Sequence, residues 1–190
     1  LSPAWAGERD RAAVLVFAGG RLLWRIVRNR RLRRFFSVGP HYVVPTERGI
    51  HRQIRLATGC AVGPFREFKS LVRLLARGEE TAATVFLVGR STAELQRIEQ
   101  NFRATFPGVR ILGRAAFYPS SLDSITTAIR KAAPRIVLSS LDSRALFRWV
   151  CEYDDRIGSS LTVIAPRALG RVAGRIDAAT EDARRIAQHG

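Results

Sequence analysis

From residue 83 onward, short β-rich runs alternate with segments of helical periodicity. Four runs rich in Val, Ile and Leu are bounded by Gly, Pro or Ser, which is typical of buried strands; they are residues 84–88, 109–112, 135–139 and 161–165. Residues 42–44 are a further candidate strand. Because strands that alternate with helices form βαβ units, this order predicts an α/β fold with a mostly parallel sheet flanked by helices.

Helix boundaries are marked by capping and stop signals. Ser91 and Glu94 have the spacing of a capping box, and the helix that they open ends before Pro107. Ser120 with Asp123 indicates a second start of this kind. The remaining helices are predicted over about residues 142–156, after Gly63 and Pro64, and over residues 175–188.

Residues 20–38 place nine large apolar side chains among seven arginines and contain no acidic residue. We therefore predict a basic amphipathic helical arm over residues 1–40 and an α/β domain over residues 41–190. Arginine attracts anionic lipid, and the aromatic side chains suit the headgroup boundary, so a membrane surface is the preferred partner. The residues expected to contact it are Trp24, Arg25, Arg28, Arg30, Arg31, Arg33, Arg34 and Phe35.

Two other interpretations of the arm stay open. Its apolar face would pack on the domain or on a second copy in a homo-oligomer, with the arginines in solvent. Nucleic acid is the third candidate and is disfavoured, because the chain has no recognised reading motif.

Charge and cysteine content limit the class of protein. Lysine and arginine outnumber Asp and Glu by 32 to 16, which favours phosphate, nucleic acid or anionic lipid over acidic small substrates, although a high genomic G+C content also enriches arginine. The two cysteines form no CxxC pair, and no cluster with metal-ligand spacing is present, so we expect no metal and a reducing compartment. No apolar run has the length of a membrane-spanning helix.

The stretch over residues 84–121 resembles the central signature of the WecG/TagA/CpsF glycosyltransferases. It has a strand, a Gly-containing turn and a helix, followed by an asparagine-led element over residues 101–108 and an I-x-G element over residues 111–113. The resemblance extends over roughly residues 42–175. It implies a Rossmann-like sheet and transfer of N-acetylmannosamine or a related sugar from a UDP donor to a lipid-linked acceptor. The expected location is the cytoplasmic face of the membrane, with the UDP-sugar as substrate and no cofactor.

The resemblance also implies a set of site residues. Where the family carries a general-base Asp, this chain offers Glu47, whose carboxylate has the right chemistry to deprotonate a sugar hydroxyl, although a surface glutamate is the plainer interpretation. The family's Arg-x-x-Gly element corresponds to the segment that contains Arg55. The residues expected to bind the donor are Arg55, Thr58 and Gly59 at a phosphate, the backbone of Gly89 at an anion, and Phe117 and Tyr118 beneath the uracil ring. Phe117 and Tyr118 are equally compatible with the core, and Gly89 with a plain connection.

Other family positions are changed. The Gln and Glu of the family's "G-x-G-x-P-x-Q-E" loop are replaced by Leu146 and Phe147, and its glycines by Ser140 and Asp142. Two hydrophobic side chains cannot make the hydrogen bonds of Gln and Glu, so they do not bind the same sugar in the same way. We therefore expect a glycosyltransferase-family protein of cell-envelope polysaccharide biosynthesis with weakened or lost catalysis. The alternative is a non-catalytic protein that binds at the membrane surface as a scaffold.

Overall fold

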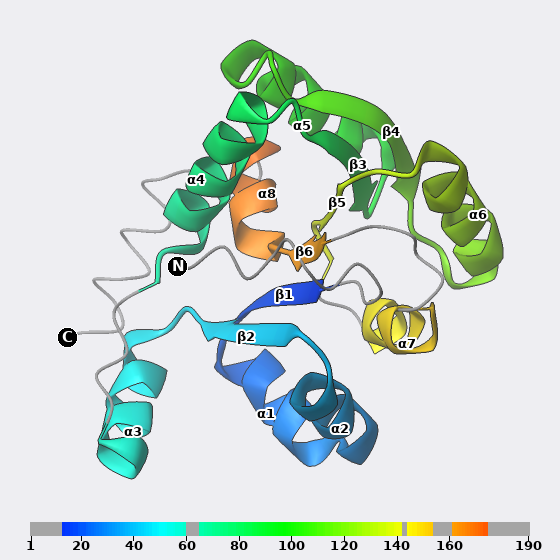
Figure 1. The fold of residues 1–190 in the computed structure, drawn as a ribbon. Helices are drawn as coiled ribbons and strands as arrows, with labels where there is room; N and C mark the ends of the chain where they lie inside the picture. Colours follow the sequence, from blue (N-terminus) through cyan, green and yellow to red (C-terminus); the bar gives the residue numbers. More distant parts are fainter. Residues whose placement is uncertain (1–12, 60–64, 142–143, 154–160, 175–190) are drawn as a thin grey trace.

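The computed structural model of the protein describes residues 13–59, 65–141, 144–153 and 161–174. Within these ranges lies one six-stranded sheet in which all the strand pairs are parallel, with the order β2-β1-β6-β5-β3-β4 (Figure 1). The predicted α/β fold with a mostly parallel, Rossmann-like sheet is confirmed. The strands are β1 (Ala13–Ala18), β2 (His41–Pro45), β3 (Thr84–Gly89), β4 (Arg110–Ala116), β5 (Ile136–Ser139) and β6 (Leu161–Ile164).

Helices cover both faces of the sheet (Figure 1). They are α1 (Gly20–Arg28), α2 (Arg30–Val38), α3 (Arg48–Thr58), α4 (Glu67–Glu80), α5 (Thr92–Thr105), α6 (Leu122–Ala132), α7 (Arg144–Tyr153) and α8 (Pro166–Val172), with a 3-10 turn η2 (Pro119–Ser121) before α6. One apolar cluster joins the sheet to α1, α2, α6 and α7. A second cluster joins the opposite face to α4, α5 and α8.

The connections follow one rule of direction. Connections that lead to a strand nearer the β2 edge place their helices on one face of the sheet; these helices are α1, α2, α6 and α7. Connections that lead to a strand nearer the β4 edge place α4 or α5 on the opposite face. This arrangement is expected when every crossover between parallel strands has the same hand. The helix α3 lies beyond the β2 edge (Figure 1).

Ser91 caps α5 as the sequence predicts. Its hydroxyl accepts the backbone N–H of Glu94 (3.3 Å), and the Glu94 carboxylate accepts the N–H of Arg90 (3.2 Å), one residue before the cap. The second predicted start is shifted, because Ser120 lies within η2 and α6 begins at Leu122. The predicted helix over residues 175–188 lies outside the described residues.

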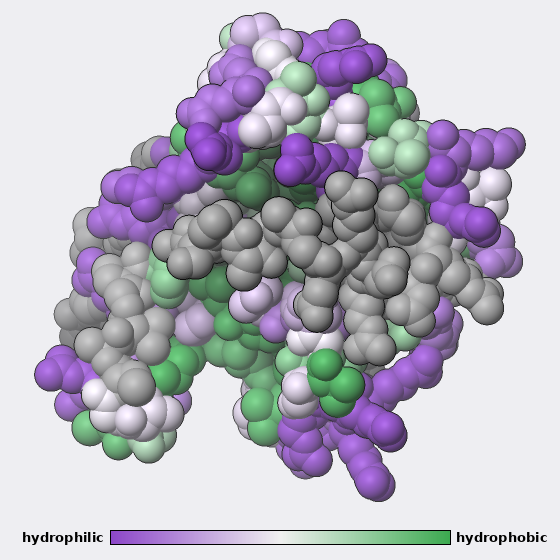
Figure 2. Space-filling model, in the orientation of Figure 1, coloured by the Kyte–Doolittle hydropathy of each residue, from purple (hydrophilic) through white to green (hydrophobic). Residues whose placement is uncertain are grey.

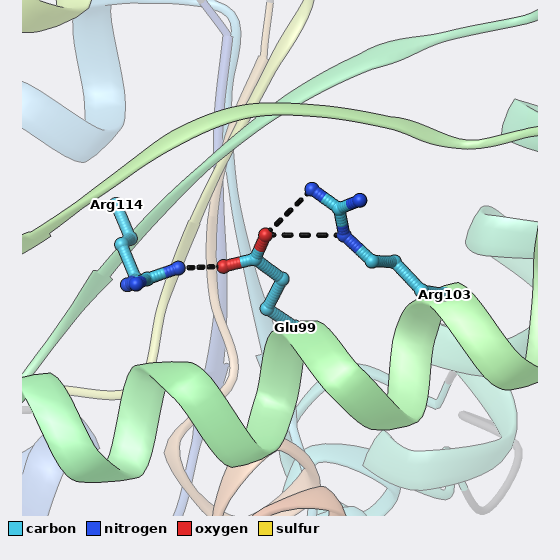
Figure 3. Close-up of polar contacts among 3 residues, drawn as sticks. All are labelled: Glu99, Arg103 and Arg114. Atoms are coloured by element: carbon cyan, nitrogen blue, oxygen red, sulfur yellow. Dashed lines mark hydrogen bonds and ion pairs between the residues drawn. The ribbon is translucent and has the colours of Figure 1, made fainter.

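The outer edge of the sheet at β4 is lined by charge. Arg110 and Arg114 alternate along this strand, and Figure 3 shows the Glu99 carboxylate of α5 between Arg114 and Arg103. Arg103 binds Glu99 from the next turn of the same helix at 2.7 Å. Glu99 therefore ties α5 to the edge strand, and charged side chains on an edge strand oppose pairing with another chain.

Residues of the predicted N-terminal arm contribute to the sheet and its cover. Residues 13–18 form β1, which lies between β2 and β6, and the following residues form two helices that meet at Asn29. The Asn29 side chain accepts the N–H groups of Arg31 (3.0 Å) and Leu32 (3.2 Å), so the break is a helix cap. The division of the chain into an arm over residues 1–40 and a domain over residues 41–190 stays a prediction.

Candidate functional site

The carboxyl ends of parallel strands lie at one edge of the sheet, and open α/β sheets bind ligands there. The residues that follow each strand in the structure are Gly19 after β1, Thr46 and Glu47 after β2, Arg90 after β3, Phe117 and Tyr118 after β4, Ser140 after β5, and Ala165 to Arg167 after β6. Because β1 lies between β2 and β6, the ends of these three strands are neighbours.

Glu47 lies at the start of two helices. It is the N-cap residue of α3, and its carbonyl accepts the N–H groups of Ile50 (3.1 Å) and His51 (3.3 Å). Its carboxylate lies against the start of α1: a Cβ built on Gly19 falls 2.6 Å from Oε1, and one built on Gly20 falls 3.0 Å from Oε2. A side chain at Gly19 would therefore displace the carboxylate from this position, and one at Gly20 would crowd it.

Arg167 is the cation beside this carboxylate. Its Nη2 lies 3.4 Å from Glu47 Oε1, and the Glu47 side chain stays 43% exposed. Arg167 belongs to the first turn of α8, 120 residues further along the chain. The pair therefore spans the ends of β2 and β6, across β1.

A buried carboxylate holds the start of α8. Glu67 Oε1, on α4, accepts the backbone N–H groups of Arg167 (2.9 Å) and Ala168 (2.8 Å). A carboxylate at a helix N-terminus is stabilised both by these charge-assisted hydrogen bonds and by the helix dipole. Glu67 therefore fixes the backbone that carries Arg167.

Glu94 likewise places a carboxylate at the start of a helix, α5, where it accepts the N–H of Arg90. The preceding Gly89 is close-packed, because an added Cβ would lie 2.6 Å from Leu95 Cδ2 and 3.1 Å from Ser140 Oγ. The backbone N–H of Arg90, in the turn that the sequence suggests for an anion, is thus already used by the protein's own carboxylate. At α1, α5 and α8, helix starts that would suit a phosphate have a glutamate beside them.

The predicted phosphate contacts on α3 lie at its far end. Arg55, Thr58 and Gly59 occupy the last turn and cap, where they are exposed. The Thr58 hydroxyl donates to the carbonyl of Ile54 (2.8 Å), and Gly59 ends the helix with a positive φ of 70°. The glycine of this motif therefore has a local role as a helix cap.

The predicted stacking pair is divided between core and surface. Phe117 is buried and meets the Trp149 ring edge-on at 6.1 Å, whereas Tyr118 is 54% exposed. Phe117 follows β4 and Arg55 belongs to the helix after β2, and these strands are the two opposite edges of the sheet. The structure therefore brings Glu47 next to Gly19 and Arg167, and it does not gather the predicted donor contacts at one point.

The two residues that the sequence resemblance places at the family's Gln and Glu are in the core. Leu146 and Phe147, on α7, are buried in the cluster that also holds Trp149 and Val150. Ser140, which the resemblance places at a family glycine, is also buried, and its hydroxyl has no hydrogen-bond partner within the described part of the chain. The carboxyl edge of the sheet is therefore filled by buried side chains near β5 and α7.

The helices α1 and α2 present a basic surface made by their exposed arginines, and hydrophilic side chains gather over this part of the molecule in Figure 2. Their inner face buries Leu22, Ile26 and Leu32, and the outer face exposes Trp24 (63%), whose ring lies 4.3 Å from the Arg28 guanidinium carbon. Most predicted lipid contacts are exposed: Arg28, Arg30, Arg31, Arg33 and Arg34, whereas Arg25 is half-buried. Phe35 instead stacks on His41 (3.9 Å between ring centroids).

Sequence reasoning missed Arg167, Glu67 and Gly19. An apolar run followed by two glycines is a signal for a strand, a turn and a helix, and it would have identified Gly19 at the end of β1. Arg167 and Glu67 carry no such local signal, because their partners are distant in the sequence.

An all-parallel sheet with covered faces and polar residues at its carboxyl edge is the architecture of many nucleotide-binding enzymes. The family model described as "Glycosyl transferase WecG/TagA/CpsF family" matches residues 3–187, and the chain belongs to this family. No curated protein matches the chain. Over the described ranges, no helix has the length and apolar character needed to cross a membrane, and no group of three or more His, Cys, Asp or Glu suits a metal ion.

Proposed function

We propose that this glycosyltransferase-family protein binds a UDP-sugar at the carboxyl edge of its sheet and transfers the sugar weakly, or no longer transfers it. The observation that carries the proposal is the position of Glu47. Its half-exposed carboxylate lies at the end of β2 beside Gly19 and Arg167, at the edge where ligands of such sheets bind. The expected sugar is N-acetylmannosamine or a related one, and the expected acceptor is lipid-linked.

The proposed chemistry is a single displacement at the sugar. The Glu47 carboxylate takes the proton of the acceptor hydroxyl, and the hydroxyl oxygen forms a bond to C1 of the sugar. The bond between C1 and the phosphate oxygen breaks, and UDP leaves with its electron pair. Arg55, Thr58 and Gly59 are the proposed phosphate contacts, the turn at Gly89 is a further proposed anion contact, and Phe117 and Tyr118 are the proposed contacts beneath the uracil ring. Because β2 and β4 are opposite edges of the sheet, a bound donor would have to draw these groups closer together than they lie in the structure.

Weak catalysis is proposed because buried apolar residues occupy the positions at which the resemblance implies polar contacts to the donor. Leu146 has no exposed surface and Phe147 is buried beside it, so neither position offers a polar group to a sugar. Phe117 is also engaged with Trp149, and stacking under a base would require it to leave that contact.

The proposed location is the cytoplasmic face of a membrane. The basic surface of α1 and α2 has no acidic residue in its own sequence, and it exposes Trp24, Val27 and Val38 between arginines. Anionic headgroups neutralise such a surface, and each basic residue near it contributes about 1 kcal/mol. This contact would bring the sheet edge to a lipid-linked acceptor.

The second candidate is a non-catalytic scaffold at the membrane surface. It is favoured by Glu94 and Glu67, whose carboxylates accept backbone N–H groups at the starts of α5 and α8 and so leave fewer of them for a donor diphosphate. In this alternative the basic surface still binds the membrane, and no sugar transfer takes place.

Titration calorimetry with UDP and UDP-N-acetylmannosamine separates the two. Specific binding of the nucleotide sugar, followed by loss of slow transfer or donor hydrolysis in Glu47→Gln, supports the enzyme. Glu80→Gln is the matched control, because Glu80 is an exposed glutamate in a local pair with Arg77. A folded protein that binds anionic vesicles and no nucleotide contradicts donor binding and supports the scaffold.

A further inference from the structure

We propose that Arg167 and Glu67 are positioning residues that hold the Glu47 carboxylate in one orientation at the end of the sheet. The inference rests on the proposed function, because a defined orientation matters most if Glu47 serves as the base. It joins residues from three separate elements, α4, α8 and the turn after β2, into one arrangement.

The first link is between Glu67 and the backbone of α8. Glu67 is buried, and a single oxygen accepts both the Arg167 and the Ala168 N–H groups. Hydrogen bonds to an ionised acceptor are stronger than neutral ones, and both donors belong to the first turn of α8. The direction in which Arg167 leaves the helix is therefore set by α4.

The second link is between the Arg167 guanidinium and Glu47. The cation approaches Oε1 at 3.4 Å, while Gly19 and Gly20 border the same carboxylate closely enough that an added Cβ would lie 2.6 and 3.0 Å from its oxygens. Glu47 is thus limited by backbone on one side and by a cation on the other. Both partners are about half-exposed, so this pair contributes little to stability, and its effect is on orientation.

Carbodiimide modification of Glu47, quantified by peptide mass spectrometry, measures this restraint without any need for activity. Removal of the cation in Arg167→Ala should speed the modification of Glu47 roughly two- to fivefold, the range that an exposed ion pair supports. Arg167→Lys keeps the charge and should restore part of the protection. Arg97→Ala, at an exposed arginine of α5, is the control and should leave Glu47 unchanged.

The Glu67 link is tested with two variants. In Glu67→Gln the side-chain carbonyl oxygen still accepts both N–H groups, so Glu47 modification and slow hydrogen exchange at Arg167 and Ala168 should be retained. In Glu67→Ala both the exchange and the modification should become faster. If Glu67→Ala does not fold, the Arg167 variants still decide the proposal.

Unchanged Glu47 modification in Arg167→Ala overturns the inference, even if the protein binds UDP-sugar. The converse result is also informative. If Arg167→Ala speeds the modification and Arg167→Lys reverses it, while no nucleotide binds, the positioning stands and the proposed function fails.

Discussion

Glu67 and Arg167 stand 100 residues apart in the sequence, and the carboxylate of the first accepts the backbone N–H of the second at 2.9 Å. The same oxygen accepts the next N–H of α8 at 2.8 Å. This contact joins two helices on one face of the sheet by a buried charge. It combines a structural role, the capping of α8, with the placement of the only exposed cation that the described residues bring within 4.0 Å of the Glu47 carboxylate.

We expect Glu67→Ala to lower the free energy of unfolding by about 1.5–3 kcal/mol, because two hydrogen bonds to a charged acceptor are lost and the start of α8 is left without its cap. Urea denaturation followed by circular dichroism measures the change. Glu80→Ala should change stability by less than about 1 kcal/mol, because its pair with Arg77 is exposed. Equal midpoints for Glu67→Ala and the wild type would contradict this role.

We expect Gly19→Ala to displace Glu47 while leaving the fold nearly as stable. The new Cβ would lie 2.6 Å from Glu47 Oε1, and the end of a flexible side chain can move away at low cost. The thermal midpoint should shift little, whereas carbodiimide modification of Glu47 should change clearly. Gly49→Ala is the matched control, because a Cβ there meets no atom within 4 Å and Ala is favoured over Gly in a helix. A normal Glu47 reactivity in Gly19→Ala would show that the contact does not restrain the side chain.

The strands of the sheet's centre could be predicted because their signal is local. The runs that became β5 and β6 are apolar except for Ser139 and Thr162, and burial of every residue in both strands explains why. The start of α5 could be predicted because Ser91 and its partner Glu94 lie within one helical turn. The strand β1 is also apolar, but it lies within the residues for which a helical arm is predicted.

The missed helices have weaker signals. In α3 only Ile50 and Ile54 supply large, partly buried apolar contacts, and Leu56 is exposed, so its amphipathic pattern is faint. The helix α8 is short and begins at Pro166. The Glu47 position could be proposed from its place after a candidate strand. Its partner Arg167 could not, because their contact depends on the order β2-β1-β6, which no local pattern contains.

Placing on α7 the Gln and Glu that the sequence resemblance implies should unfold the protein before it improves donor binding. Leu146→Gln and Phe147→Glu would each place a polar group in a position that is at most 2% exposed. An unpaired polar group in such a core costs several kcal/mol, and the loss of apolar packing adds to it. The double variant should therefore lose its cooperative thermal transition. Leu146→Met is the control, because it keeps the volume of the core. A stable double variant with stronger UDP-sugar binding would show that α7 can turn these positions toward the edge.

The basic surface of α1 and α2 should bind anionic lipid, and the carboxyl edge of the sheet should bind the UDP-sugar, so variants in each should affect a different ligand. Arg30→Ala, on the exposed side of α2, should weaken sedimentation with anionic vesicles roughly fivefold, because one basic residue near the surface contributes about 1 kcal/mol. It should leave nucleotide binding unchanged. Arg55→Ala, on α3, should instead weaken UDP-sugar binding about tenfold by removing a charged phosphate contact.

Both variants remove one positive charge, so each is the charge control of the other, and Arg97→Ala on α5 controls for net charge alone. Vesicle binding should also fall as salt is raised, because the exposed arginines are screened. Equal effects of Arg30→Ala and Arg55→Ala in both assays would mean that the chain has one diffuse basic surface. In that case Arg55 would belong to the membrane contact, and the proposed donor contacts would lose their phosphate end.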